Sequence, residues 1–237
     1  MGRQKTARTV IHTHNKMNSQ YSDWNITPTH NQNVMMKEEI DQRTFEDQSI
    51  NKDHSYQNVV NESYEIPNIV KLREQASEPA DDQFIEAVTL CLLNIFETNI
   101  LHQQNEQDDQ RAAEELRTKI LHFFQYLSQY TNSTRSELAV TIFLISKLVD
   151  KDIEYRAKGD VGIISELNLG TILLVALELA TKLMRDVSYK NSWWAKALGM
   201  ETATLNSSES VFLQRLHFEL NMPESVFWSL YLRLSGY

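Results

Sequence analysis

The chain has 237 residues, of which 41% are apolar, and its formal net charge at pH 7 is −9. This charge excludes a nucleic-acid partner from our expectations, because affinity for phosphates depends on clustered Lys and Arg side chains. With a single cysteine, Cys91, the chain cannot form an internal disulfide, and the apolar helical pattern around that residue predicts a buried, inert thiol.

Residues 1 to about 75 are rich in Asn, Gln, His, Ser and Thr and show no sustained periodicity of 3.6 or 2. We predict a disordered polar N-terminal region over residues 1–80 and one folded domain over residues 81–237. No apolar stretch follows the basic residues at the start, so we expect no secretory signal and a location in the cytoplasm or nucleus. His12 and His14 have no carboxylate or thiol close in sequence, which indicates solvated side chains and no metal site.

Apolar residues recur at helical spacing from about residue 82 onward, and no proline occurs between Pro79 and Pro223. This favours long helices joined by short connections. The first predicted helix spans about residues 82–101, and a polar loop follows over residues 102–110. A second helix then ends near Thr131. The apolar faces are Ile85, Val88, Leu92, Ile95 or Phe96, and Ile100 in the first helix, and Leu116, Ile120, Phe123, Leu127 and Tyr130 in the second.

The third predicted helix begins at the sequence Thr134-Arg135-Ser136-Glu137, which is a capping box. Its inner face consists of Leu138, Ile142, Ile145 and Val149. A connection containing two glycines runs from Leu148 to Asn168, and Asn168 is placed to cap the fourth helix, from Leu169 to about Arg185. Because the fourth helix is apolar nearly all the way round, we expect other helices to surround it.

The most apolar stretch, Leu169 to Met184, is shorter than the ~20 residues that span a bilayer, and it contains charged residues. We therefore predict a core helix and no membrane partner. A last strong helix is predicted from about Thr204 to His217, and Glu224 to Leu234 has the pattern of the beginning of one more. The inner side of the last strong helix consists of Leu205, Val211 or Phe212, Leu213 and Leu216. Together these elements predict an all-α domain.

Two stretches of the predicted domain carry spaced polar residues that an apolar helix alone does not explain. The first includes Lys182, Asp186, Tyr189, Asn191, Trp194 and Gly199, and the second includes Leu205, Asn206, Glu209, Leu213, Phe218 and Leu220. They resemble the third and fifth helices of the cyclin box in the Pho80-like group of cyclins, also called P-type or U-type. The resemblance covers about Asp82 to Leu234. It implies a single cyclin box, a five-helix bundle around a buried central helix, with an extra N-terminal helix.

The resemblance implies a regulatory subunit that binds and activates a cyclin-dependent protein kinase, Pho85-like or similar. It implies control of the cell cycle or of nutrient signalling, without a cofactor or a metal. The kinase-binding residues carried over from the family are Lys182, Leu183, Asp186, Glu209, Leu213, Phe218 and Leu220. Lys182 and Glu209, which are 27 residues apart, match the family's interface pair, and Asp186 matches an acid that can pair with a kinase arginine.

The residues themselves leave alternatives open. A Lys and a Glu on adjoining helix ends can donate to carbonyls and accept from amides of a docked loop. Lys182 and Glu209 can equally form a structural salt bridge, or Lys182 can pair with Glu178 at i, i+4 spacing. Asp186 is equally suited to ordering a loop. We interpret Trp194 as a core residue and leave Trp193 open.

Enzymatic function is not expected, because the sequence has no Walker loop and no GxGxxG, HExxH or CxxC motif. The alternative function is a cyclin-fold adaptor or scaffold that binds another protein without activating a kinase. Two features depart from the Pho80-like pattern. Arg185 stands where an acid is common, and the connection from Leu148 to Asn168 is longer than the group usually has.

Overall fold

The structure, a computed structural model, describes residues 69–97 and 106–237. Its helices are, in order, α3 (Ile69–Ser77), α4 (Asp82–Phe96), α5 (Glu106–Thr131), α6 (Arg135–Ala157), the short 3-10 helix η3 (Glu166–Asn168), α7 (Leu169–Met184), α8 (Asn191–Ala197), α9 (Thr202–Arg215) and α10 (Glu224–Leu234). These described residues form no strand, so the predicted all-α class is confirmed. Ala76–Tyr237 belongs to one compact unit, and residues 69–75 belong to another.

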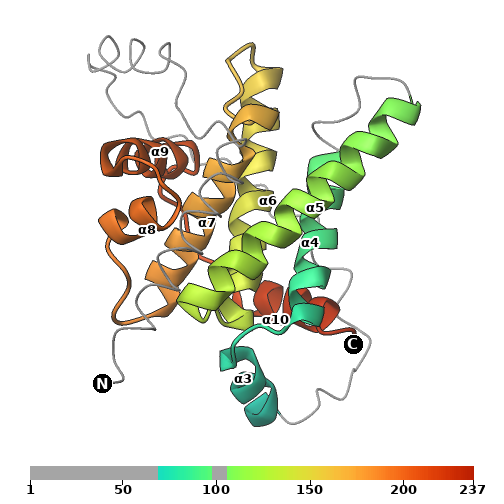
Figure 1. The fold of residues 1–237 in the computed structure, drawn as a ribbon, viewed down its shortest axis with the longest axis vertical. Helices are drawn as coiled ribbons and strands as arrows, with labels where there is room; N and C mark the ends of the chain where they lie inside the picture. Colours follow the sequence, from blue (N-terminus) through green and yellow to red (C-terminus); the bar gives the residue numbers. More distant parts are fainter. Residues whose placement is uncertain (1–68, 98–105) are drawn as a thin grey trace, which may run out of the picture. The chain divides into compact units, whose positions relative to one another are not determined.

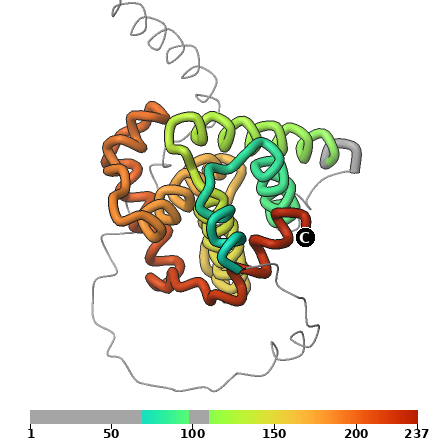
Figure 2. The backbone as a smooth tube through the Cα atoms, turned by 90° about the horizontal axis from the view of Figure 1, so that it is seen from below, coloured from blue at the N-terminus to red at the C-terminus, as the bar shows by residue number. Residues whose placement is uncertain are grey.

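Helices α6 and α7 form the centre of the unit that contains Ala76–Tyr237 (Figure 1). Helix α6 packs against α7, α4, α9 and α10, and α7 also packs against α9. Helix α5 packs across α4 (Figure 2). Every α7 residue from Leu169 to Thr181 is buried except Thr171, which confirms the expectation of a buried central helix.

The helical run Glu166–Met184 is long and apolar enough to cross a membrane by length and composition alone, and 67% of its most apolar stretch is buried inside the protein. The 16 residues of α7, Leu169–Met184, are fewer than the ~20 that span a bilayer, and the burial of the run agrees with the predicted core helix. Its packing against α6 and α9 accounts for the apolar composition, as in the core helix of a soluble protein.

Two helices are longer than the sequence pattern predicts. Helix α5 begins at Glu106, inside the predicted polar loop, and α6 continues past Leu148 to Ala157. The added turns are polar but contain good helix formers such as Glu, Gln, Lys, Arg and Ala. The connection before α7 is therefore shorter than predicted and begins only at Lys158.

Three further details differ from the sequence predictions or lie beyond the described residues. Helix α3 lies within the stretch where the sequence indicates no helix. Residues 1–68 of the predicted tail are outside the described residues, as is Ile100, so the tail and its boundary at residues 80 and 81 stay predictions. Asn168 does precede α7, but its side chain does not cap the helix. Its Oδ1 instead accepts from the Ser165 amide at 3.0 Å.

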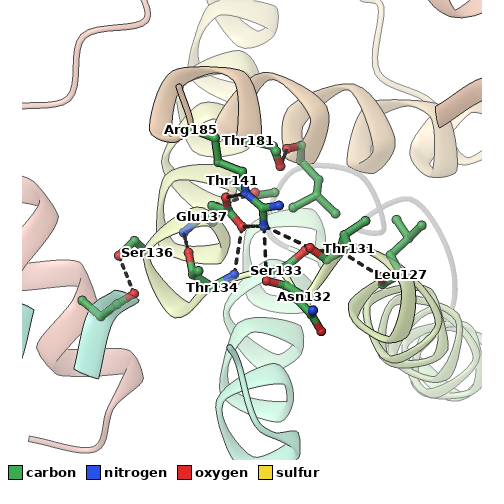
Figure 3. Close-up of polar contacts among 12 residues, drawn as sticks. Leu127, Thr131, Asn132, Ser133, Thr134, Ser136, Glu137, Thr141, Thr181 and Arg185 are labelled. Carbon is green, nitrogen blue, oxygen red and sulfur yellow. Dashed lines mark hydrogen bonds and ion pairs between the residues drawn. The ribbon is translucent and has the colours of Figure 1, made fainter. Parts of the chain in front are cut away.

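A buried ion pair connects the end of α7 to the start of α6 (Figure 3). The predicted capping box is present: Thr134 Oγ1 accepts from the Glu137 amide at 3.2 Å, and Glu137 Oε2 accepts from the Thr134 amide at 2.8 Å. Arg185, directly after α7, donates to both Glu137 oxygens, with Nη2 2.8 Å from Oε2. Its Nη2 also donates to the carbonyls of Thr131 (3.1 Å) and Asn132 (3.2 Å). Arg185 thus holds the end of α7 against the turn between α5 and α6.

We expect Arg185→Ala to lower the free energy of unfolding by about 3 kcal/mol. The substitution leaves the Glu137 carboxylate, whose side chain is 1% exposed, with only the Thr134 amide as a donor among the described residues. Lys119→Ala is the control, because Lys119 pairs with Glu115 on an exposed face of α5 and should contribute no more than about 0.5 kcal/mol. Urea unfolding measures both values, and equal losses would contradict this role for Arg185.

Candidate functional site

The two charged residues that the resemblance pairs, Lys182 and Glu209, are in contact. Lys182 lies in the last turn of α7 and Glu209 lies on α9, and Lys182 Nζ is 2.5 Å from Glu209 Oε1. Asn191, the first residue of α8, joins them. Its Oδ1 accepts from Lys182 at 2.8 Å, and its Nδ2 donates to Glu209 Oε2 at 2.5 Å and to Asn206 Oδ1 at 2.9 Å. Three helices therefore meet at one polar site.

A second carboxylate, that of Glu178, lies one turn before Lys182 on α7. Its side chain is 0% exposed, and its Oε1 is 2.8 Å from Lys182 Nζ. Its Oε2 accepts no hydrogen bond from a described residue, so the Lys182 ammonium is its compensation. Burial raises the pKa of Glu178 to about 6, although the Lys182 ammonium opposes the increase. We refer to Glu178, Lys182, Asn191, Asn206 and Glu209 as the polar cluster.

The ammonium group of Lys182 is surrounded by acceptors. It has three N–H donors, and the three neighbours are Glu178 Oε1, Glu209 Oε1 and Asn191 Oδ1. Burial opposes the charge on Lys182, but the hydrogen bonds and charges of the two glutamates outweigh burial and raise its pKa. Both ion pairs that the sequence offers as alternatives, Lys182 with Glu178 and Lys182 with Glu209, are present together.

The other predicted kinase-binding residues lie at the ends of α7 and α9. Leu183 is 48% exposed and Phe218 is 66% exposed. Leu213 and Leu220 are half-buried, and Asp186 is exposed in the bend after α7. Sequence reasoning missed two further exposed apolar residues beside Leu183, namely Met184 and Val187. They lie where α7 leaves the core, and helical periodicity carries no signal for that position.

The backbone after α9 places Phe218 in solvent. His217 and Phe218 have φ values of 52° and 60°, in the left-handed region that non-glycine residues rarely adopt. The Phe218 amide donates to the Leu213 carbonyl at 2.8 Å, which closes the turn. Such residues cost of order 1–3 kcal/mol each and persist where surrounding contacts hold them. This turn ends α9 at Arg215, before the predicted His217.

Two single residues noted in the sequence occupy different environments. Trp194 is 0% exposed, which confirms it as a core residue, while Trp193 is half-buried and stacks on Tyr189 with ring centroids 4.2 Å apart. Cys91 is half-buried, less than predicted, and its Sγ is 3.6 Å from Nη2 of Arg233. Burial raises the pKa of Cys91, which lowers the thiolate fraction.

Within the described ranges, no group of three or more His, Cys, Asp or Glu side chains could hold a metal ion. The site consists of hydrogen-bonded polar groups with exposed apolar residues, and not of an arrangement for nucleophilic or metal-assisted chemistry. Such a site can recognise another molecule through hydrogen bonds and apolar contacts.

Comparison with known families matches residues 24–220 to the family described as Cyclin. The chain therefore belongs to the cyclin family, whose members are non-catalytic regulatory proteins. Its relatives belong to the plant P-type and U-type cyclins, so the resemblance to the Pho80-like group is confirmed.

Three of the relatives show the extent of the similarity. Cyclin-U2-1 of Arabidopsis thaliana is 31% identical over 107 residues, which is 45% of each chain. Cyclin-P2-1 of Oryza sativa subsp. japonica is 31% identical over 107 residues, 45% of this chain and 46% of the relative. Cyclin-U4-3 of Arabidopsis thaliana is 23% identical over 163 residues, 67% of this chain and 71% of the relative. The matched segment spans less than half the length of the first two relatives.

The buried Glu178 predicts a pH dependence of stability. Its pKa is about 6 in the folded protein and 4.5 without the protein environment, so the folded state binds the proton more tightly. The stability gained from that proton is present below pH 4.5 and is lost as the pH rises to about 6. A pKa difference of about 1.5 corresponds to about 2 kcal/mol. As the pH rises from 4.5 to 7, the free energy of unfolding of Glu178→Gln should therefore increase by about 2 kcal/mol relative to that of the wild type.

Urea unfolding of both proteins at the two pH values measures this difference. Glu115→Gln is the control with the opposite sign, because the hydrogen bond from Lys119 lowers the pKa of Glu115. If the difference in free energy of unfolding between Glu178→Gln and the wild type stays constant with pH, Glu178 ionises in the folded protein as easily as in water.

Proposed function

We propose that this protein is the regulatory subunit of a cyclin-dependent protein kinase, Pho85-like or similar. The polar cluster, with Leu183, Leu213, Phe218 and Leu220, is the docking surface for the small lobe of the kinase. Membership of the cyclin family and the similarity to P-type and U-type cyclins support this proposal. The observation that carries it is the contact between Lys182 and Glu209, accompanied by the exposure of Leu183 and Phe218.

The polar cluster has unequal capacity for new hydrogen bonds. Each oxygen of Glu209 accepts one hydrogen bond within the cluster, and a carboxylate has about four acceptor positions. A docked backbone amide can therefore bond Glu209 without displacing a neighbour. A carbonyl that reaches Lys182 has to replace one of its three acceptors. Because the cluster fixes both side chains in advance, little side-chain entropy is lost on docking.

The consequence for the kinase is indirect. A protein kinase requires an ion pair between a strand lysine and a glutamate on a mobile helix of the small lobe. A subunit that holds this helix inward completes the active site and contributes no reacting group. The chain would act in this way in the cytoplasm or nucleus, in control of the cell cycle or of nutrient signalling.

Lys182→Ala and Glu209→Ala should each weaken binding to a purified Pho85-like kinase by about 2–5 kcal/mol, or roughly 30-fold or more, because each removes one member of a hydrogen-bonded set that becomes desolvated in the complex. Calorimetry or a pull-down of the purified kinase measures the loss. Lys119→Ala and Glu115→Ala remove an exposed ion pair on α5, at 2.6 Å, and should leave kinase binding unchanged. Equal binding by all four variants would remove Lys182 and Glu209 from the interface.

Both substitutions should also lower the free energy of unfolding. The side chains of Lys182 and Glu209 are 28% and 17% exposed, so they are not surface charges that can be lost at no more than about 0.5 kcal/mol. Lys182→Ala also leaves buried Glu178 without its cation. The double variant Lys182→Ala, Glu178→Gln removes that charge. It should melt closer to the wild type than Lys182→Ala alone and still fail to bind the kinase.

A kinase assay separates a regulatory subunit from a cyclin-fold adaptor or scaffold. Addition of this protein to the purified kinase should raise its phosphorylation rate on a peptide substrate by at least about tenfold, because the kinase helix is then held inward. Glu209→Ala should need a higher concentration for the same rate. Binding with no increase in rate would favour the adaptor.

A further inference from the structure

The loop between α6 and α7, residues 158–165, is fixed by a buried acid. Asp152 of α6 is 2% exposed, and its two oxygens accept from Arg156 Nε at 2.9 Å and from the Ile163 amide at 2.6 Å. Arg156 Nη2 in turn donates to the Ile164 carbonyl at 2.6 Å. Two side chains of α6 thus hold the backbone of the loop through charge-assisted hydrogen bonds.

Two glycines permit this loop conformation. Gly159 has a φ of +87°, which allows the chain to turn at the end of α6. At Gly162, a Cβ atom would lie 2.0 Å from Nε of Arg156, so a side chain there would displace Arg156 from its bonds with Asp152 and Ile164. The loop is therefore a constrained element, whose conformation depends on Arg156 staying in place.

The constrained loop presents an apolar side chain to solvent. Val161 is 74% exposed, while its carbonyl accepts from Nη2 of Arg215 at 3.2 Å. The Arg215 guanidinium lies 4.0 Å from the centre of the Tyr155 ring, which fixes the donor. An apolar side chain on a fixed backbone loses little conformational entropy when a partner covers it. Val161 therefore has the properties of a contact residue.

The loop adjoins the proposed docking surface. Arg215, which holds Val161, is the last residue of α9 and precedes the turn that exposes Phe218. Tyr155 Oη is 3.4 Å from His217 Nε2, and the two rings stack with centroids 6.3 Å apart. Direct contacts thus run from the Val161 carbonyl through Arg215 and Tyr155 to the residue before Phe218. These contacts place the α6–α7 loop beside the turn that exposes Phe218.

We propose that the α6–α7 loop is a second contact surface for the kinase, on which Val161 extends the docking surface beyond Phe218 and contributes to the choice of kinase. This inference rests on the proposed function. Continuity with the docking surface assigns the kinase as the occupant, in preference to a second copy of this chain. The loop lies between α6 and α7, outside the polar cluster, so its contribution can be removed while the cluster stays intact.

The test compares the full-length wild type and Val161→Asp for binding to a purified Pho85-like kinase by calorimetry. We expect Val161→Asp to bind at least about tenfold more weakly, because a desolvated valine is replaced by a charge. Its melting temperature should equal that of the wild type, because Val161 is exposed. The control is Val226→Asp, an exposed valine in the first turn of α10, where an acidic residue suits the helix dipole.

Gly162→Ala supplies a second variant, which keeps Val161 but displaces Arg156 and so should also weaken kinase binding. Unchanged kinase affinity in both variants, with binding still lost in Glu209→Ala, would overturn this inference and leave the proposed function standing. A wild-type protein that binds no cyclin-dependent kinase would overturn both. A third outcome would also overturn this inference. If light scattering shows a dimer for the wild type and a monomer for Val161→Asp, and both bind the kinase equally, the loop is a self-association surface.

Discussion

The architecture around the candidate site depends on the compensation of buried carboxylates. A carboxylate taken out of water is costly unless a cation or several donors surround it. The buried acids of the described residues are Glu137, Asp152 and Glu178, and each has one cation, which is Arg185, Arg156 and Lys182 respectively. Each pair fixes a different feature. Arg185 with Glu137 holds the end of α7, Arg156 with Asp152 holds the α6–α7 loop, and Glu178 holds the Lys182 ammonium of the polar cluster.

The candidate site could be located from the sequence only in part. The spacing of Lys182 and Glu209 pointed to their pairing because it resembles a family pattern, and the capping box at Thr134 and Glu137 depends on residues close in sequence. The ion pair between Glu137 and Arg185 joins residues 48 positions apart. No local pattern reports such a contact, because it arises only when α6 and α7 pack together.

The remaining differences have physical reasons of the same kind. The first turns of α5 and the last turns of α6 are polar, so hydrophobic periodicity cannot distinguish an exposed helix from a loop there. The end of α9 is set by positive φ angles at His217 and Phe218, where no glycine gives a signal. Glu178 lies within an apolar run, and its burial follows from the neighbours around α7.

A structural role and a docking role for Lys182 are compatible. The ammonium already has three acceptors in the free chain, so a new bond to a kinase carbonyl replaces an existing one, and the net electrostatic gain from that exchange is small. Affinity must then come mainly from desolvation of exposed apolar residues such as Leu183 and Phe218. The polar cluster supplies register and specificity, because a partner that covers it without matching its donors and acceptors leaves buried charges unpaired.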